Sequence, residues 1–152
     1  MTPLPIEQET VLVRLNGIQG EIAELTQLAQ TPLEQFAKGN DFKLAQYHLH
    51  RALEGVFHIA AHLLSRLPGG YAGGTYKEMT RLLGEKKILP AEFADTVLCK
   101  MAGYRNRLVH FYAEISPAEL HGILQHHLPD IETFLRHVKG VLADPARFGF
   151  SS

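Results

Sequence analysis

The stretch MAGYRNRLVHFYAEI, residues 101–115, holds the side chains of this sequence best suited to chemistry. Arg105 carries a permanent positive charge on a planar fork of donors that fits phosphate oxygens. His110 can give and take a proton near neutral pH. Two such groups could cleave RNA without a metal ion. The arginine would neutralise charge that builds on the phosphate, and the histidine would move a proton at the attacking or leaving oxygen.

The spacing of these two residues complicates that chemistry. On an ideal helix, Arg105 and His110 lie roughly 140° apart, whereas Arg105 and Tyr112 nearly eclipse each other. Either the helix loosens near His110, or a second subunit completes the site across a symmetry axis. Taken alone, an arginine and a histidine at this spacing are also typical of a surface ion-pair partner and a histidine that caps a helix.

The composition is that of a globular protein, with 45% hydrophobic and 20% charged residues among 152. We expect one domain over residues 1–152. A net charge of −1 argues against a protein that coats nucleic acid by bulk electrostatics, although basic residues outnumber acidic ones between residues 75 and 107. The sequence has no apolar run of the roughly 18–20 residues that span a membrane and no secretory signal at its N-terminus. We therefore expect a cytoplasmic protein with no membrane contact.

Apolar residues recur at three- and four-residue intervals along most of the chain, which predicts helices. The first two should cover about residues 7–30 and 41–66, with Thr31-Pro32 ending the first. After a glycine-rich loop, Thr75 and Glu78 form a capping box for a short helix. Another helix restarts after Pro90, and Ser116-Pro117 begins the last, which Pro129 kinks or divides. The sequence predicts an all-α, up-and-down bundle of about five helices.

The segment RNRLVHFY resembles the R-x4-H-x-Y signature of the HepT-like toxins (the DUF86 group) of the HEPN superfamily. The resemblance extends over roughly residues 10–140. It includes the blocks TPLEQFAKGNDFKLAQYHLHRALEGVFHIAAHLLS, TYKEMTRLL and ILPAEFADTVLCKMAGYRNRLVHFY, and the tail ISPAELHGILQHHLPDIETFL fits the family's last helices. The implied fold is a HEPN-like helical bundle.

The resemblance implies a function and a set of site residues. Arg105 and His110 stand at the HEPN catalytic positions, which implies a metal-independent endoribonuclease toxin with no cofactor and with a cleft between two protomers of a homodimer. Tyr112 matches the motif tyrosine, the acceptor of AMP groups from a partner minimal nucleotidyltransferase, the antitoxin. An anionic nucleotide there would fill the cleft and repel RNA phosphate. We expect Asn106 to make a positioning hydrogen bond, and Arg107 to contact either phosphate or solvent.

Two features of the segment 41–66 bear on this site. Glu54 falls where the family often has an acidic residue, whereas His58 replaces what is commonly another acid. A polar stripe runs opposite the apolar one, and its central glycine, Gly55, suggests close approach of another helix. We propose that this stripe lines or borders the dimer cleft; its members are His48, Arg51, Gly55, His58 and His62.

Two other functions stay open from the residues. His58 and His62 are spaced to present two imidazoles to zinc, with His126-His127 as further ligands, but no carboxylate stands at the offset found in H-E-x-x-H. The second is a catalytically inactive HEPN domain that serves as an adaptor or dimerisation module, or as a nucleotide-binding partner of a nucleotidyltransferase. The intact pair of Arg105 and His110 argues against it.

Overall fold

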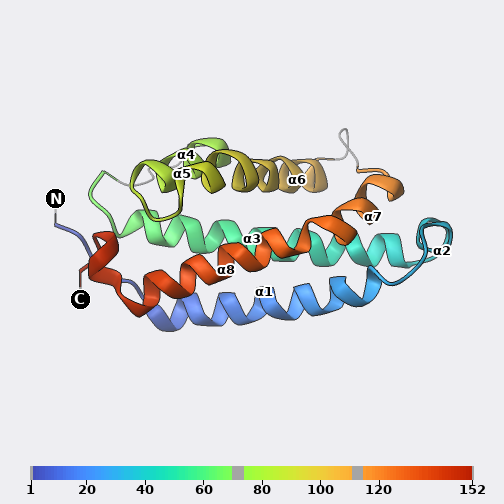
Figure 1. Cartoon of the computed structure of the whole chain (residues 1–152), viewed down its shortest axis with the longest axis horizontal. Coiled ribbons are helices and arrows are strands. Elements are labelled where there is room, and N and C mark those ends of the chain that lie inside the picture. Colours follow the sequence, from blue (N-terminus) through green and yellow to red (C-terminus); the bar gives the residue numbers. More distant parts are fainter. Residues whose placement is uncertain (1, 70–73, 111–114, 152) are drawn as a thin grey trace.

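The computed structural model describes residues 2–69, 74–110 and 115–151, and these residues form an elongated helical bundle (Figure 1). Helices make up almost all of its regular structure. Within the described ranges the one β-type pairing is an isolated bridge between Pro5 and Ser151, which joins the two ends of the chain. Both termini lie at the same end of the bundle in Figure 1. The predicted all-α fold class is confirmed.

Two long helices, α1 (Gln8–Leu28) and α3 (Asp41–Ser65), lie side by side in the bundle. Their bounds agree with the predicted 7–30 and 41–66. The apolar stripe of α1 is buried as its spacing predicted, at Val11, Leu15, Ile18, Ile22 and Leu25. Between the two helices, α2 (Leu33–Lys38) was not predicted. It has six residues, too few to show a helical period, and it holds Phe36 fully buried at that end of the core.

A second layer packs on α3, on the side away from α1 (Figure 1). It consists of α4 (Tyr76–Glu85), α5 (Ala91–Phe93), a π-helical turn (Ala94–Leu98) and α6 (Cys99–Val109). The side chain of Thr75 caps α4 by accepting the backbone N–H of Glu78, as the capping box predicted. The π turn was not predicted. It inserts a wider turn into what is otherwise one helix from Ala91 to Val109.

The C-terminal part contains α7 (Pro117–His126), α8 (Leu128–Ala143) and a 3-10 turn (Pro145–Phe148). Ser116 caps α7 by accepting the backbone N–H of Glu119. The break between α7 and α8 falls at His127, and Pro129 stands in the first turn of α8. The expected division at this proline is therefore confirmed. Because α7 and α8 are separate helices, the described residues contain more helices than the five or so that were predicted.

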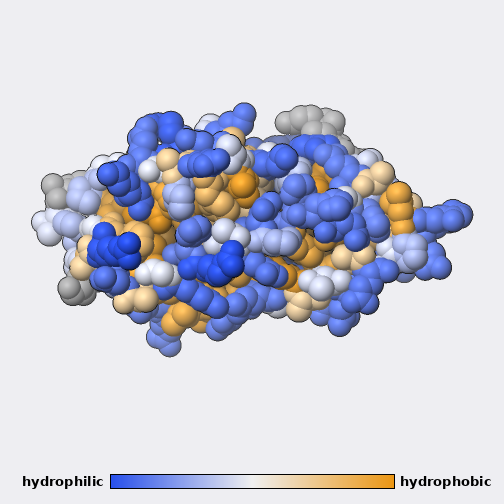
Figure 2. Space-filling model, in the orientation of Figure 1, coloured by the Kyte–Doolittle hydropathy of each residue, from blue (hydrophilic) through white to orange (hydrophobic). Residues whose placement is uncertain are grey.

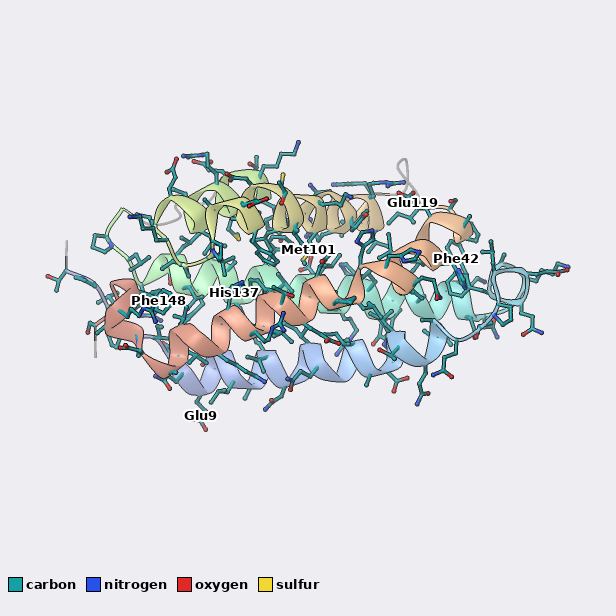
Figure 3. The ribbon with its side chains drawn as sticks, viewed as in Figure 1. Glu9, Phe42, Met101, Glu119, His137 and Phe148 are labelled. Carbon is teal, nitrogen blue, oxygen red and sulfur yellow. The ribbon has the colours of Figure 1, made fainter. Side chains whose placement is uncertain are left out.

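Polar side chains cover most of the face drawn in Figure 2, with apolar atoms visible in the furrows between helices. The interior is a single apolar cluster to which all the long helices contribute. In Figure 3, Met101 points from α6 into this interior. Across the described residues, no helix combines the length and the apolar character needed to cross a membrane.

Candidate active site

Arg105 lies one turn before the end of α6, and two other elements hold its guanidinium. Its Nε donates to Oε1 of Glu54 on α3 at 2.5 Å. Its Cζ lies 4.6 Å from the ring centroid of Tyr76 in α4, a cation–π contact. Tyr76 in turn stacks on Phe57 of α3 at 4.8 Å and 7°. The Tyr76 ring contacts the face of the guanidinium and the Glu54 carboxylate contacts its edge, so the guanidinium is held in one orientation.

The hydrogen bond to Glu54 uses only Nε of the Arg105 guanidinium and does not involve its two terminal nitrogens. Nη1 of Arg105 lies 3.3 Å from Oδ1 of Asn106, a long hydrogen bond. Nη2 has no hydrogen-bond partner among the described residues. The side chains of Arg105 and Glu54 are 22% and 24% exposed, so the pair is sheltered but open to solvent at its rim. A guanidinium fixed at Nε, with Nη2 unbonded among the described residues, can receive an anion.

His110 is the first residue after α6. Its backbone is extended, with φ −101° and ψ 117°, while its N–H still donates to the carbonyl of Asn106. Its side chain is exposed. Of the two solutions to the spacing problem, the structure thus contains the first: the helix ends at Val109, and helical phase does not set the direction of His110. Tyr112, the expected modification site, lies outside the described residues.

Arg107 is held by Glu119 at the start of α7, which Figure 3 places beside the C-terminal end of α6. The two side chains form a bidentate pair in which Nη1 and Nη2 each donate at 2.6 Å. The hydrogen bond from Arg107 lowers the pKa of the Glu119 carboxyl. Arg107 is therefore paired with Glu119, although 35% of its side chain stays exposed to solvent. A phosphate contact stays a prediction that would require this pair to open.

A cavity of about 380 Å³ lies between α1 and α3, next to the Arg105 pair. Glu54 belongs to both, because it faces this groove and also accepts from Arg105. Four members of the predicted site or stripe line it, and α1 supplies most of the rest. The α1–α3 groove is lined by Arg14, Gly17, Ile18, Glu21, His50, Arg51, Glu54, Gly55 and His58.

At Gly55, α3 approaches α1 closely within this groove. A Cβ at this position would lie 2.7 Å from Cγ1 of Ile18 on α1, which is too close for any side chain without movement. The close approach predicted from Gly55 is thus confirmed, and the helix that approaches is α1 of the same chain. That the stripe also borders a dimer cleft stays a prediction.

Two histidines flank Glu54, one helical turn to either side. Nε2 of His50 lies 3.7 Å from its Oε1, and Nε2 of His58 lies 3.8 Å from its Oε2. Nη1 of Arg14 lies 2.8 Å from Nδ1 of His58. Because a guanidinium only donates, this Nδ1 accepts, which places the ring proton of a neutral His58 on Nε2, facing Glu54. Arg14 and His50 were not predicted as site residues. A single arginine or histidine on an exposed helix face gives no indication in sequence of what it contacts.

Arg51 and His48 share the other carboxylate of the groove, Glu21. Nε of Arg51 donates to Glu21 Oε1 at 2.7 Å, and Nδ1 of His48 lies 2.6 Å from Oε2. Burial alone would raise the pKa of Glu21, but the hydrogen bonds from Arg51 and His48 outweigh it and lower the pKa. The predicted supporting residue Arg51 is therefore held by α1 and not by the residues around Arg105.

His58 and His62, considered above as zinc ligands, have different partners in the structure. His62 accepts the backbone N–H of Glu7 through Nε2 at 3.1 Å, whereas His58 contacts Arg14. Within the described part of the chain, no three His, Cys, Asp or Glu side chains gather closely enough to hold a metal ion.

The family follows from a match over most of the chain. The sequence profile described as "Ribonuclease HepT-like" matches residues 18–138, which include both carriers of the site, α3 and α6. The chain belongs to this HepT-like family. The resemblance stated from RNRLVHFY and its neighbouring blocks is confirmed.

Individual relatives agree with this assignment. The chain is similar to "mRNA nuclease HepT" of Shewanella oneidensis, with 32% identity over 92 residues, 60% of this chain and 68% of the relative. It is 25% identical over 138 residues to "tRNA nuclease HepT" of Aphanizomenon flos-aquae, covering 90% and 92% of the two chains. A solved structure of the tri-AMPylated Shewanella oneidensis HEPN toxin in complex with MNT antitoxin superposes with a TM-score of 0.76 at 25% identity, covering 86% and 96%. The two nucleases are named for different RNAs.

Proposed function

We propose that this HepT-like chain is a metal-independent endoribonuclease and the toxin of a toxin–antitoxin pair. The observation that carries the proposal is the held guanidinium of Arg105, fixed at Nε by Glu54 and open at Nη2, a few residues before the exposed His110. Membership of the Ribonuclease HepT-like family and the nuclease names of two relatives support it.

The chemistry requires only these two side chains and the RNA itself. The ribose 2′-oxygen forms a bond to the adjacent phosphorus, the bond from phosphorus to the 5′-oxygen breaks, and a 2′,3′-cyclic phosphate results. Arg105 neutralises the charge that builds on the phosphorus oxygens. One His110 imidazole takes the proton from the 2′-hydroxyl, and the protonated His110 of the other protomer gives one to the leaving 5′-oxygen, so the protons balance. In our proposal a homodimer supplies the cleft, with Arg105 and His110 drawn from both protomers.

The nuclease proposal is tested with Arg105→Ala and His110→Ala, with His126→Ala as the control. His126 is also exposed and lies at the end of a helix, but outside the motif. Both motif variants should lose RNA cleavage and relieve growth inhibition while remaining folded, and the control should cleave like wild type. Cleavage should persist in excess chelator. If both motif variants are as toxic as wild type, the nuclease assignment is wrong, and an inactive adaptor is favoured.

We further propose that a minimal nucleotidyltransferase partner neutralises the toxin by transferring AMP to Tyr112. The AMPylated HEPN toxin in complex with MNT antitoxin, to which this chain is similar, motivates the proposal. Co-expression with a candidate nucleotidyltransferase should add one or more AMP units to the intact mass, and Tyr112→Phe should abolish the gain. A mass gain that survives in Tyr112→Phe would place the modification elsewhere.

A further inference from the structure

An exposed tyrosine stands at one end of the α1–α3 groove. Tyr47, on α3, is 55% exposed, so its ring presents surface to solvent. Cζ of Arg51, which lines the groove, lies 5.4 Å from the centroid of the Tyr47 ring. His48 meets the same ring edge-on at 5.2 Å and 73°. The ring thus has charged and aromatic neighbours and still presents surface to solvent.

Hydrogen bonds to α1 hold this tyrosine's neighbours in place. Glu21 accepts from Nε of Arg51 and contacts Nδ1 of His48, so one carboxylate fixes both side chains that touch Tyr47. Arg51 uses Nε for this bond, and its terminal nitrogens take no part in it. A fixed cation beside an exposed ring is the combination that stacks bases and meets the phosphates between them.

Tyr47 lies on the same helix as Glu54, the residue that holds Arg105. Tyr47, Arg51 and Glu54 follow one another at four and three residues along α3, so they share one face of the helix. From Tyr47 to Glu54 the helix rises about 10 Å. Neighbouring nucleotides of a single strand can span that distance. An RNA strand with its phosphate at Arg105 would therefore bring a nearby base within reach of the tyrosine.

We propose that Tyr47, supported by Arg51, stacks an unpaired nucleobase of the RNA substrate close to the cleaved bond. The inference rests on the proposed ribonuclease function and gives it a substrate class: RNA that is single-stranded at this position. A base paired within a duplex keeps its faces against its own neighbours and is not available for stacking on a side chain.

The chain contains no tryptophan, so Tyr47→Trp creates a single fluorescent reporter at the proposed stacking position. Phe148→Trp is the matched control. Like Tyr47, Phe148 has an arginine beside its ring: Cζ of Arg147 lies 5.7 Å from the ring centroid. Phe148 is partly buried and lies in the 3-10 turn, at the end of the bundle where both termini lie. The probe is an unstructured RNA of about ten nucleotides, 2′-O-methylated so that no 2′-hydroxyl can attack. It is added alone or annealed to its complement, and wild-type cleavage of the unmodified strand is measured in parallel.

We expect the single strand to quench the fluorescence of Tyr47→Trp and to leave that of Phe148→Trp unchanged, and we expect the duplex to quench neither variant. Tyr47→Ala should bind the single strand about tenfold more weakly, and Tyr47→Phe, which keeps the ring, within about twofold of wild type.

The remaining outcomes separate the stacking proposal from the nuclease proposal. If wild type cleaves RNA but Tyr47→Trp is not quenched, or if Phe148→Trp is quenched equally, the stacking proposal is wrong and the nuclease stands. If wild type does not cleave, the nuclease proposal fails, while quenching confined to Tyr47→Trp still supports the stacking site. An unquenched Tyr47→Trp together with an altered oligomeric mass of Tyr47→Ala would overturn the stacking proposal and mark a protein-binding surface.

Discussion

The proposed chemistry depends most on the contact between Glu54 and Arg105. A double-mutant cycle measures the coupling free energy between these two side chains. The two side chains are 24% and 22% exposed and meet at 2.5 Å. An exposed ion pair contributes about 0–1 kcal/mol, and removing one partner of a fully buried pair costs about 3–5 kcal/mol. Because this pair is mostly but not fully buried, we expect a coupling free energy of about 1.5–2 kcal/mol.

The assay is urea unfolding of wild type, Glu54→Ala, Arg105→Ala and the double variant at neutral pH. A second cycle on Lys38 and Glu34 serves as the control, because these side chains also meet, at 3.1 Å, but are 75% and 81% exposed. That pair should couple by no more than about 0.5 kcal/mol. If the free-energy changes at Glu54 and Arg105 add to within about 0.3–0.5 kcal/mol, the two groups are independent and our description of a held guanidinium is wrong.

The same contact should matter more to cleavage than to folding. Glu54→Gln keeps an oxygen that can accept from Nε of Arg105 but removes its charge, so the protein should lose only about 1 kcal/mol of stability. The fork of Arg105 would then be less strictly oriented toward phosphate. We expect cleavage of RNA to fall about 10- to 100-fold under conditions in which the variant is fully folded. Cleavage at the wild-type rate would show that Glu54 does not position Arg105.

Three further predictions concern the contacts around the site. Gly55→Ala should destabilise the protein by about 1–3 kcal/mol in thermal or urea unfolding, because its Cβ would meet the α1 isoleucine at 2.7 Å. Gly20→Ala, in open space on α1, should stabilise by about 0.5–1 kcal/mol, and equal effects at the two positions would contradict the close approach. Burial, and then the charge of Arg66, lower the pKa of His62, so the folded state binds this proton less readily than the unfolded chain. Stability should fall as pH drops below 6.5, and His62→Gln should reduce that fall; an unchanged pH profile would refute the assignment. Glu119→Gln should cost about 0.5–1 kcal/mol in urea unfolding, since its pair with arginine is about one-third exposed, and a cost of zero would show that the pair does not stabilise the fold.

The parts of the fold that were predicted from sequence are those set by neighbours along the chain. The caps at Thr75 and Ser116 depend on residues three positions away, and both form as predicted. The long helices show their period over many turns. The short α2 and the π turn at Ala94–Leu98 were missed, because six or fewer residues carry no readable period and a π turn has no sequence signature.

The site was less accessible to sequence reasoning because its contacts join residues far apart in the chain. Glu54 and Arg105 are separated by 51 positions, and only the resemblance to a family with an acidic residue there drew attention to Glu54. Tyr76, whose ring lies against the guanidinium of Arg105, follows a glycine-rich stretch of sequence, and nothing in the sequence indicated this contact. The partner of Arg107 was missed for the same reason, since a bidentate pair with Glu119 depends on how α6 and α7 meet.

The end of α6 explains how one motif can hold its two catalytic candidates so differently. Arg105 is inside the helix, where its backbone is fixed and α3 and α4 can hold its guanidinium. His110 is outside, and the pair of Arg107 with Glu119 anchors the last turn to α7 just before the chain leaves the helix. The group proposed to stabilise charge is therefore held by two neighbouring helices, whereas the group proposed to transfer a proton lies just past the end of α6. Had α6 continued through His110, the imidazole would have pointed roughly 140° away from the arginine.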